Sequence, residues 1–258
     1  MLHRVRLLGV RCRERRHARL ERAHLEGTFV LDELETFETD RRLQPVTMAV
    51  LVHGPSFLVV HRVVAPLPAR GRLGPRDLRR KAEFERLRGR RTSGSGGAVA
   101  EFLDVFGACL RPGSRVRTDP KATDRTILRD VLGLRAVHER TPGRCRRNRA
   151  NPLFAVQHTF ARVRDGVSRL VPRTWAHAKL RLRLAEHAGV WDAWRNCVRG
   201  ITNVATRTTP AMAAGIESRP FEITDFVRCR ARCPEVLRGQ PAGPANGTSQ
   251  RGQLPLGV

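Results

Sequence analysis

The sequence predicts an α/β protein in which a mixed sheet is flanked by helices. Three segments rich in β-branched residues follow one another closely, and helical segments then alternate with two further short strands. With 258 residues and a hydrophobic content of 40%, the chain can bury a substantial core. We expect one α/β core at residues 27–228, a basic arm at 1–26 and a tail at 229–258.

Three predicted strands open the core. Residues 27–38, GTFVLDELETFE, contain an apolar run at Phe29–Leu31 that indicates a buried strand. The segments Val46–Val52 and Phe57–Val64 are short and β-branched, and the His-Gly-Pro-Ser run between them is typical of a hairpin turn. Three strands in such quick succession indicate an antiparallel meander.

A charged insertion separates these strands from the rest of the core. Pro66–Gly74 has the Pro, Gly and Arg content of a loop, and Pro75–Gly89 predicts a highly charged helix. Arg90–Gly97, RRTSGSGG, predicts a flexible linker. Residues 66–97 are therefore expected to form a loop or insertion, after which the apolar residues of Ala98–Leu110 return at helical spacing.

Two short strands enclose a further helix. Ser114–Asp119 predicts a strand that ends on a carboxylate, and Arg135–Glu139 predicts another strand. Between them, Thr123–Leu132 has its apolar residues on one helical face. A basic loop, Arg140–Ala150, follows.

Long helices come next, and the two ends of the chain are expected to be disordered. One helix opens at Asn151–Pro152 and keeps apolar residues at every third or fourth position up to Leu170. A second covers Trp175–Arg199, with a break or kink near Gly189. The Arg-rich N-terminal arm is poorly patterned, which indicates disorder or a short helix, and the tail is rich in Gly, Pro, Ser and Asn.

The net charge is strongly positive. Lys and Arg number 49 against 24 Asp and Glu, which gives +25 and a pI near 11.7. Such an excess favours a polyanionic partner, nucleic acid first and an anionic membrane second. Only three of the basic residues are lysines and no tyrosine is present, a composition that GC-rich coding DNA also produces. We therefore rely on the positive sign of the net charge more than on its magnitude.

Neither a membrane span nor a zinc cluster is expected. The chain has no run of about 18 apolar residues, and its N-terminus lacks the apolar segment of a secretory signal. The six cysteines are scattered, and one C-x₃-C, at Cys229 and Cys233, is weak evidence for zinc. We expect reduced thiols in a cytoplasmic, nucleoid-associated protein.

Two aspartates occupy positions that suit a metal site. Asp32 lies within the first strand after an apolar run, and Asp119 ends the fourth strand. Carboxylates at strand ends can converge on one hard cation and leave coordination positions for water and phosphate. Each residue also has a plainer interpretation, because a strand-ending Asp is often a turn former and the glutamates around Asp32 can form a solvated strand edge. These glutamates are Glu33, Glu35 and Glu38.

Several motifs resemble the DDE-type transposases of bacterial insertion sequences. They are LDELETFE around Asp32, the TD-x-K around Asp119, the run NPLFAVQHTFARVRDGVSRLVPRTWAHAK from Asn151, and a late TPAM-x-AG. The similarity extends from about Gly27 to Asp225. It implies an RNase-H-like catalytic core, with Asp32 and Asp119 as the first and second ligands of Mg²⁺ or Mn²⁺.

The third acidic position of that family departs from its usual residue. It lies on the long helix as Glu or, in some branches, Asn, and here Gln157 matches it. Gln keeps a coordinating oxygen but removes the charge. Gln157 and Arg164 are seven residues apart and share one helical face, where Arg164 matches a basic residue of the family and is expected to contact a phosphate. Alternatively, both residues simply face solvent.

DNA is the expected partner, as transposon ends and as target, together with a second copy of the chain in a homodimer and no membrane. The DNA-binding candidates are Arg164, Lys121, Arg146 and Arg147. Three dense basic clusters, Arg76–Lys81, Arg86–Arg91 and Arg144–Arg149, either neutralise phosphates or form a solvated surface of GC-biased composition.

Three functions compete at this point. The first is a transposase that cuts and joins DNA by Mg²⁺-assisted attack of water or a 3′-hydroxyl on phosphodiester bonds. The second is an inactive remnant that binds DNA non-specifically, since Gln157 departs from the family and residues 1–26 replace the zinc-binding and helix-turn-helix segments usual in relatives. The third is an unrelated basic nucleic-acid-binding protein, which the motif matches disfavour.

Overall fold

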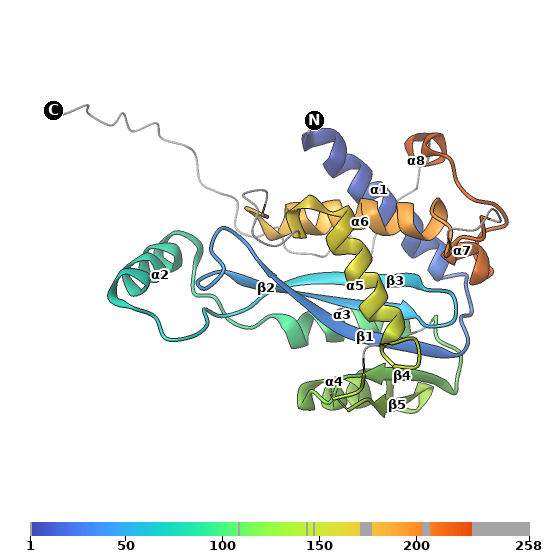
Figure 1. The fold of residues 1–258 in the computed structure, drawn as a ribbon, viewed down its shortest axis with the longest axis horizontal. Helices are drawn as coiled ribbons and strands as arrows, with labels where there is room; N and C mark the ends of the chain where they lie inside the picture. Colours follow the sequence, from blue (N-terminus) through green and yellow to red (C-terminus); the bar gives the residue numbers. More distant parts are fainter. Residues whose placement is uncertain are drawn as a thin grey trace.

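A five-stranded mixed sheet forms the centre of the protein (Figure 1). The computed structural model describes residues 2–107, 109–142, 144–146, 148–170, 177–202 and 207–228. In spatial order the strands are β3-β2-β1-β4-β5. Their bounds are Thr28–Phe37 for β1, Pro45–His53 for β2, Leu58–Pro66 for β3, Ser114–Thr118 for β4 and Ala136–Arg140 for β5.

The strand directions divide the sheet into two parts. β1, β2 and β3 pair antiparallel, as the meander prediction requires, with a turn at His53–Leu58 between β2 and β3. β4 pairs parallel with β1, and β5 pairs parallel with β4. The prediction of a mixed sheet flanked by helices is confirmed, and the arrangement is consistent with an RNase-H-like core.

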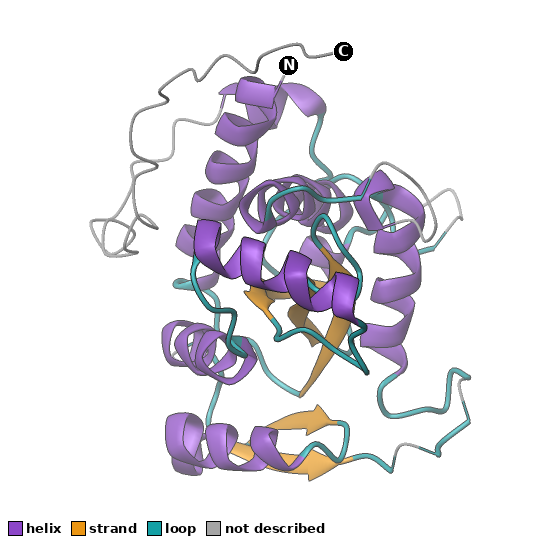
Figure 2. Cartoon of the chain, turned by 90° about the vertical axis from the view of Figure 1, so that its left-hand side faces the viewer, coloured by secondary structure: helices purple, strands orange, loops and turns teal. Residues whose placement is uncertain are grey.

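Helices cover both faces of the sheet, as Figure 2 shows from the side. Every residue of β2 is buried because this strand is covered on both faces. On one face, Phe29 and Leu31 of β1 pack with the helices α3 (Ser95–Gly107) and α4 (Ala122–Leu132). That packing agrees with the apolar spacing of the two helices in the sequence.

The opposite face carries α5 (Phe154–Gly166) and α6 (Arg181–Cys197). Val30 and Leu34 of β1 point to this face and share a core with Trp191 of α6. The α5 helix is shorter than predicted, because it starts after Asn151–Pro152 and ends at Gly166, before a short 3₁₀ turn over Ser168–Leu170.

The N-terminal arm, expected to be disordered or a short helix, forms the helix α1 (Leu2–Leu20). It packs along α6, and Gly9 lies at the contact, where an added Cβ would be 2.7 Å from the carbonyl oxygen of Glu186. Gly189 faces Gly9 from α6, which continues through this glycine without the predicted break. A close helix crossing accounts for both glycines.

A buried ion cluster fastens α1 to the core. The carboxylate of Asp192 in α6 is fully buried and accepts hydrogen bonds from Arg16 of α1 at 3.0 Å and from Arg62 of β3 at 2.7 Å. A buried carboxylate requires such partners, because an unpaired buried charge is costly. The contact joins residues 176 positions apart in the chain.

The insertion contains one helix, α2 (Pro75–Arg88), which lies apart from the sheet in Figure 1. The linker predicted over Arg90–Gly97 ends earlier, because α3 already begins at Ser95 and this serine is buried. Three short helices complete the described chain: Gly133–Arg135, α7 (Pro210–Ala213) and α8 (Ile223–Arg228). In the described residues no helix is long and apolar enough to cross a membrane. The predicted tail at 229–258 lies outside the described residues.

Candidate functional site

The parallel pairing of β1 with β4 leads toward the two predicted aspartates. Val30 pairs with Arg117, and continuing this register by two residues on each strand brings Asp32 beside Asp119. Side chains at paired positions of parallel strands point to the same face of the sheet. The pairing itself ends at Val30 and Arg117, so the adjacency of the two carboxylates, 87 positions apart in the sequence, is an extrapolation of the register.

Asp32 belongs to the face of the sheet that α5 covers. It alternates with Val30 and Leu34, which pack into the core of that face. Asp32 is half-buried, and its Oδ1 accepts a hydrogen bond of 2.7 Å from the backbone N–H of Glu33. The residue is thus neither fully solvated nor enclosed in the apolar core.

Asp119 lies directly after β4, in the short connection to α4. It is half-buried, and its Oδ1 accepts a hydrogen bond of 3.1 Å from the backbone N–H of Lys121. Such a bond is typical of an aspartate that forms a turn, so Asp119 also fits the alternative interpretation as a turn former. The turn orients the carboxylate at the carboxyl end of the strand.

The neighbouring Glu33 is the centre of a polar network on the opposite face. Its carboxylate accepts hydrogen bonds from Lys121 at 2.7 Å, from Thr47 at 2.8 Å and from Ser95. Burial raises the pKa of Glu33, but the bonds from Lys121, Ser95 and Thr47 outweigh it and hold the pKa below its ordinary value. Glu33 is therefore not part of a solvated strand edge.

Lys121, a predicted DNA contact, has an intramolecular partner in this network. Its ammonium group is 2.7 Å from Glu33 and 3.4 Å from the hydroxyl of Ser95. A contact of Lys121 with DNA stays a prediction. The ion pair is a feature that sequence reasoning missed, although the adjacency of Glu33 to Asp32 and of Lys121 to Asp119 was visible in the motifs.

Gln157 and Arg164 lie on α5, beside its buried stripe. Gln157 is half-buried and Arg164 is exposed, whereas Val156, Phe160 and Val163 fill the core. Their shared side of the helix agrees with the prediction from the seven-residue spacing. Gln157 thus belongs to the helix that covers the face of Asp32.

Asn151 organises the basic loop before α5. Its side-chain amide donates 2.9 Å to the carbonyl oxygen of Arg146, and its Oδ1 accepts 2.8 Å from the N–H of Leu153. The backbone of Arg146 is thereby held beside the start of α5 while its side chain is exposed. Arg147 lies outside the described residues. These hydrogen bonds could have been expected from the Asn-Pro-Leu-Phe motif, because Asn side chains commonly bind nearby backbone groups.

The donors present can be compared with the needs of a divalent metal. Among the residues that the structure describes, no three His, Cys, Asp or Glu side chains are grouped to hold a metal ion. The group expected from the sequence consists of two carboxylates and the amide of Gln157. Two carboxylates with water and substrate phosphate are a donor set that Mg²⁺ accepts.

Comparison with known proteins yields distant structural likenesses and no match of sequence. The sequence matches no protein-family profile and no curated protein. The fold is similar to a chain in the cryo-electron microscopy structure of the simian T-cell lymphotropic virus intasome in complex with the PP2A regulatory subunit B56 gamma. The TM-score is 0.40 and the sequence identity 10%, over 77% of this chain and 58% of that chain. The likeness thus spans little more than half of the viral chain.

Proposed function

We propose that this protein is a DDE-type transposase of a bacterial insertion sequence, which binds DNA and cleaves or joins its strands with Mg²⁺ or Mn²⁺. The observation that supports the proposal is the parallel pairing of β1 with β4, which ends at Val30 and Arg117 and whose extension by two residues leads to Asp32 and Asp119 on one face of the sheet. The motif resemblance and the net charge of +25 support it independently.

In this proposal each residue has a role set by its position. Asp32 and Asp119 hold the metal, and the amide oxygen of Gln157 is a third, weaker donor from α5. Bound Mg²⁺ would supply Lewis-acid stabilisation of the phosphodiester and of the leaving oxygen. The exposed side chains of Arg164 and Arg146 would neutralise backbone phosphates and keep the DNA beside the carboxylates.

A nicking assay tests the enzymatic part. We expect the purified chain to nick supercoiled plasmid in Mg²⁺ or Mn²⁺ but not in EDTA, and Asp32→Asn or Asp119→Asn to abolish nicking. Asp130→Asn is the matched control, because this exposed aspartate of α4 pairs only locally with Arg129. Equal nicking by all four proteins would show a contaminating nuclease and reject the proposed site.

The second candidate function is a catalytically inactive remnant that binds DNA without cutting it. The neutral Gln157 favours it, because the third position of the site then lacks a charged metal ligand. Salt-sensitive DNA binding by the wild-type chain, without nicking under any metal condition, would support this function and reject the first.

A further inference from the structure

The helix α2 is attached to the protein by ion pairs instead of apolar packing. None of its 14 residues is buried. Asp77 pairs with Arg42 at 2.8 Å and Arg80 pairs with Asp40 at 2.9 Å, so two residues of the β1–β2 turn hold one side of the helix. A helix without a buried side chain contributes little to the core, which leaves its other side available for a partner.

Arg79 and Arg86 occupy the side of α2 that faces away from these ion pairs, whereas Arg76 lies about 40° from the paired Arg80. Arg79 and Arg86 are seven residues apart and therefore about 20° apart around the helix, and Arg76 is about 60° from Arg79. All three are exposed, and none forms an ion pair or hydrogen bond with another described residue. Of the three acidic residues of α2, Asp77 and Glu85 are paired, whereas Glu83 is exposed between Arg76 and Arg79 and has no ion-pair partner among the described residues.

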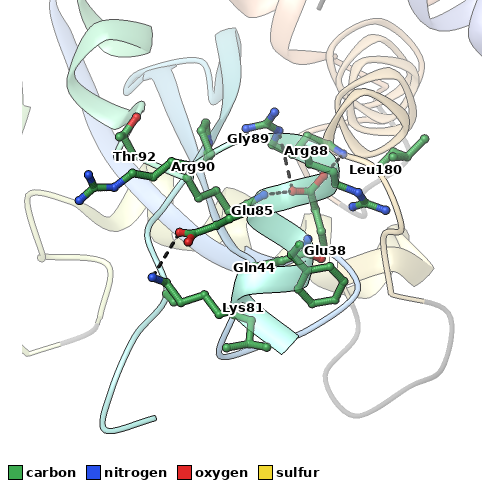
Figure 3. Close-up of a pocket in the computed structure, with 15 residues that line it drawn as sticks. Glu38, Gln44, Lys81, Glu85, Arg88, Gly89, Arg90, Thr92 and Leu180 are labelled. Atoms are coloured by element: carbon green, nitrogen blue, oxygen red, sulfur yellow. Dashed lines mark hydrogen bonds and ion pairs between the residues drawn. The ribbon is translucent and has the colours of Figure 1, made fainter. Parts of the chain in front are cut away.

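A cavity of about 300 Å³ lies at the C-terminal half of α2, and most of the charged side chains that line it are also basic (Figure 3). Its charged lining consists of five cations and two carboxylates: Lys81, Arg88, Arg90, Arg91, Arg181, Glu38 and Glu85. The surplus of three positive charges suits an anion.

Only part of that lining is engaged inside the protein. Glu38 accepts a hydrogen bond of 2.5 Å from Arg91 and another of 2.7 Å from the backbone N–H of Arg181, and Lys81 pairs with Glu85 at 3.2 Å. Arg88 and Arg90 are exposed and bind no other described residue. These two guanidinium groups border the cavity and can bind an additional anion.

We propose that Arg76, Arg79, Arg86, Arg88 and Arg90, here called the α2 basic surface, bind the phosphodiester backbone of DNA. The inference rests on the proposed DNA-handling function but concerns a surface separate from the carboxylate pair. Guanidinium groups bind phosphate in bidentate geometry without reading bases, so the contact is independent of sequence. Among the described residues, five unpaired arginines against the single unpaired Glu83 leave a net positive charge on this side of α2.

The distance between α2 and the carboxylates sets the minimum length of a DNA duplex that contacts both. Five residues of β1, about 17 Å, separate Asp32 from Phe37, and α2 is held to the turn beyond that strand. At about 3.4 Å per base pair, a duplex that reaches both sites extends at least roughly five base pairs past the carboxylates.

Fluorescence anisotropy with a labelled 30-base-pair duplex at several salt concentrations tests the α2 basic surface. We expect the triple variant R76A/R79A/R86A to bind at least about tenfold more weakly and to lower the salt slope by about three, at roughly 0.9 per phosphate contact. The double variant R88A/R90A is expected to lower the slope by about two. Thermal unfolding should be unchanged, since the substituted side chains are exposed.

The matched control removes the same charge from arginines that are already paired. R111A/R115A/R129A replaces three exposed arginines that bind Glu26, Glu139 and Asp130. Equal losses in this control and in R76A/R79A/R86A would overturn the inference and leave DNA binding as a general charge effect.

Two further outcomes separate the inference from the proposed function. A wild-type chain that binds no duplex would reject both, whereas wild-type binding with unaffected α2 variants would reject the surface alone. Co-sedimentation with vesicles containing phosphatidylserine is the third arm. If the α2 variants lose binding to the vesicles but not to DNA, the partner of the α2 basic surface is an anionic membrane and not DNA.

Discussion

The carboxylate of Glu33 and the ammonium of Lys121 are 2.7 Å apart and join β1 to the start of α4. Glu33 follows Asp32 in the chain, and Lys121 lies two residues after Asp119. The ion pair therefore connects the two segments that carry the proposed metal ligands. It lies on the other face of the sheet from Asp32 and can set the spacing of the two aspartates without contacting the metal.

Breaking this pair is expected to weaken metal binding. Lys121→Met and Glu33→Gln should each lower Mn²⁺ affinity roughly tenfold, because groups that orient metal ligands typically contribute that much. Electron paramagnetic resonance titration with Mn²⁺ measures it without requiring catalysis. The charge-swapped double variant E33K/K121E should recover part of the affinity, and an affinity unchanged in both single variants would show that the pair has no positioning role.

The matched control for that experiment is the neighbouring pair of Glu35 and Arg70. This ion pair is exposed and also starts from β1, two residues further from Asp32 than Glu33 is. Arg70→Ala should change stability by less than about 1 kcal/mol and leave Mn²⁺ affinity unchanged.

Restoring a carboxylate at the third position is expected to increase activity. Gln157→Glu supplies a charged oxygen donor from α5, so Mg²⁺-dependent nicking should rise at least about tenfold if Asp32, Asp119 and residue 157 act on one metal site. The plasmid assay described above gives the rate. An unchanged or lower rate, with the variant folded, would remove residue 157 from the site.

Removing the charge of Asp192 is expected to destabilise the fold strongly. Asp192→Asn leaves Arg16 and Arg62 without their buried counter-ion, and uncompensated buried charge costs about 3–5 kcal/mol. The free energy of unfolding in urea measures this loss. Asp130→Asn, at an exposed aspartate, should change it by less than about 0.5 kcal/mol, and a similarly small effect at Asp192 would contradict the role of the cluster.

The two glycines of the α1–α6 crossing should respond in opposite directions. Gly9→Ala would bring a methyl group within 2.7 Å of a backbone oxygen and should destabilise by about 1–3 kcal/mol. Gly189→Ala meets its nearest atom at 3.6 Å and should gain up to about 1 kcal/mol from helix propensity. Thermal unfolding of both variants checks the crossing, and equal effects would argue against it.

Acidification should destabilise the protein through His61. Burial lowers the pKa of this histidine well below its ordinary value, and the nearby arginines Arg16, Arg13 and Arg62 lower it further. Below the ordinary pKa of about 6.5, His61 is protonated in the unfolded state but stays neutral in the folded state. The free energy of unfolding therefore falls as the pH falls through that value. The expected slope is roughly 1 kcal/mol per pH unit between about pH 6 and 5. Urea unfolding at these pH values should show a smaller slope for His61→Gln, and an identical slope would assign the effect to other histidines.

Local patterns were sufficient for most of the sheet and its flanking helices. The β-branched runs on both sides of His-Gly-Pro-Ser predicted the β2–β3 hairpin, and the one-sided apolar spacing of residues 123–132 predicted α4 within one residue. These signals lie within a few consecutive residues, where backbone preference and periodicity act directly. The same holds for Asp119, since its position at a strand end is a local property.

The sequence did not separate helix α1 from a disordered arm, because the buried side of this helix has almost no apolar pattern. That side contains Gly9, Cys12, Arg16, His17 and Leu20. Arg16 and His17 are polar, and Gly9 has no side chain. Arg16 can be buried only because Asp192 of α6 is its counter-ion. Asp192 lies far from Arg16 in the sequence, so a local sequence pattern does not reveal this pairing.

The sequence by itself determined the α/β class, the order of the strands along the chain, and the places of Asp32 within a strand and of Asp119 at a strand end. Tertiary structure alone decided that Lys121 pairs with Glu33, that α1 docks on α6, and that the arginines of α2 divide into paired and free sets. The physical reason is distance along the chain. Periodicity and turn chemistry act over a few residues, whereas a partner for a buried charge can come from any segment that the fold brings within about 4 Å.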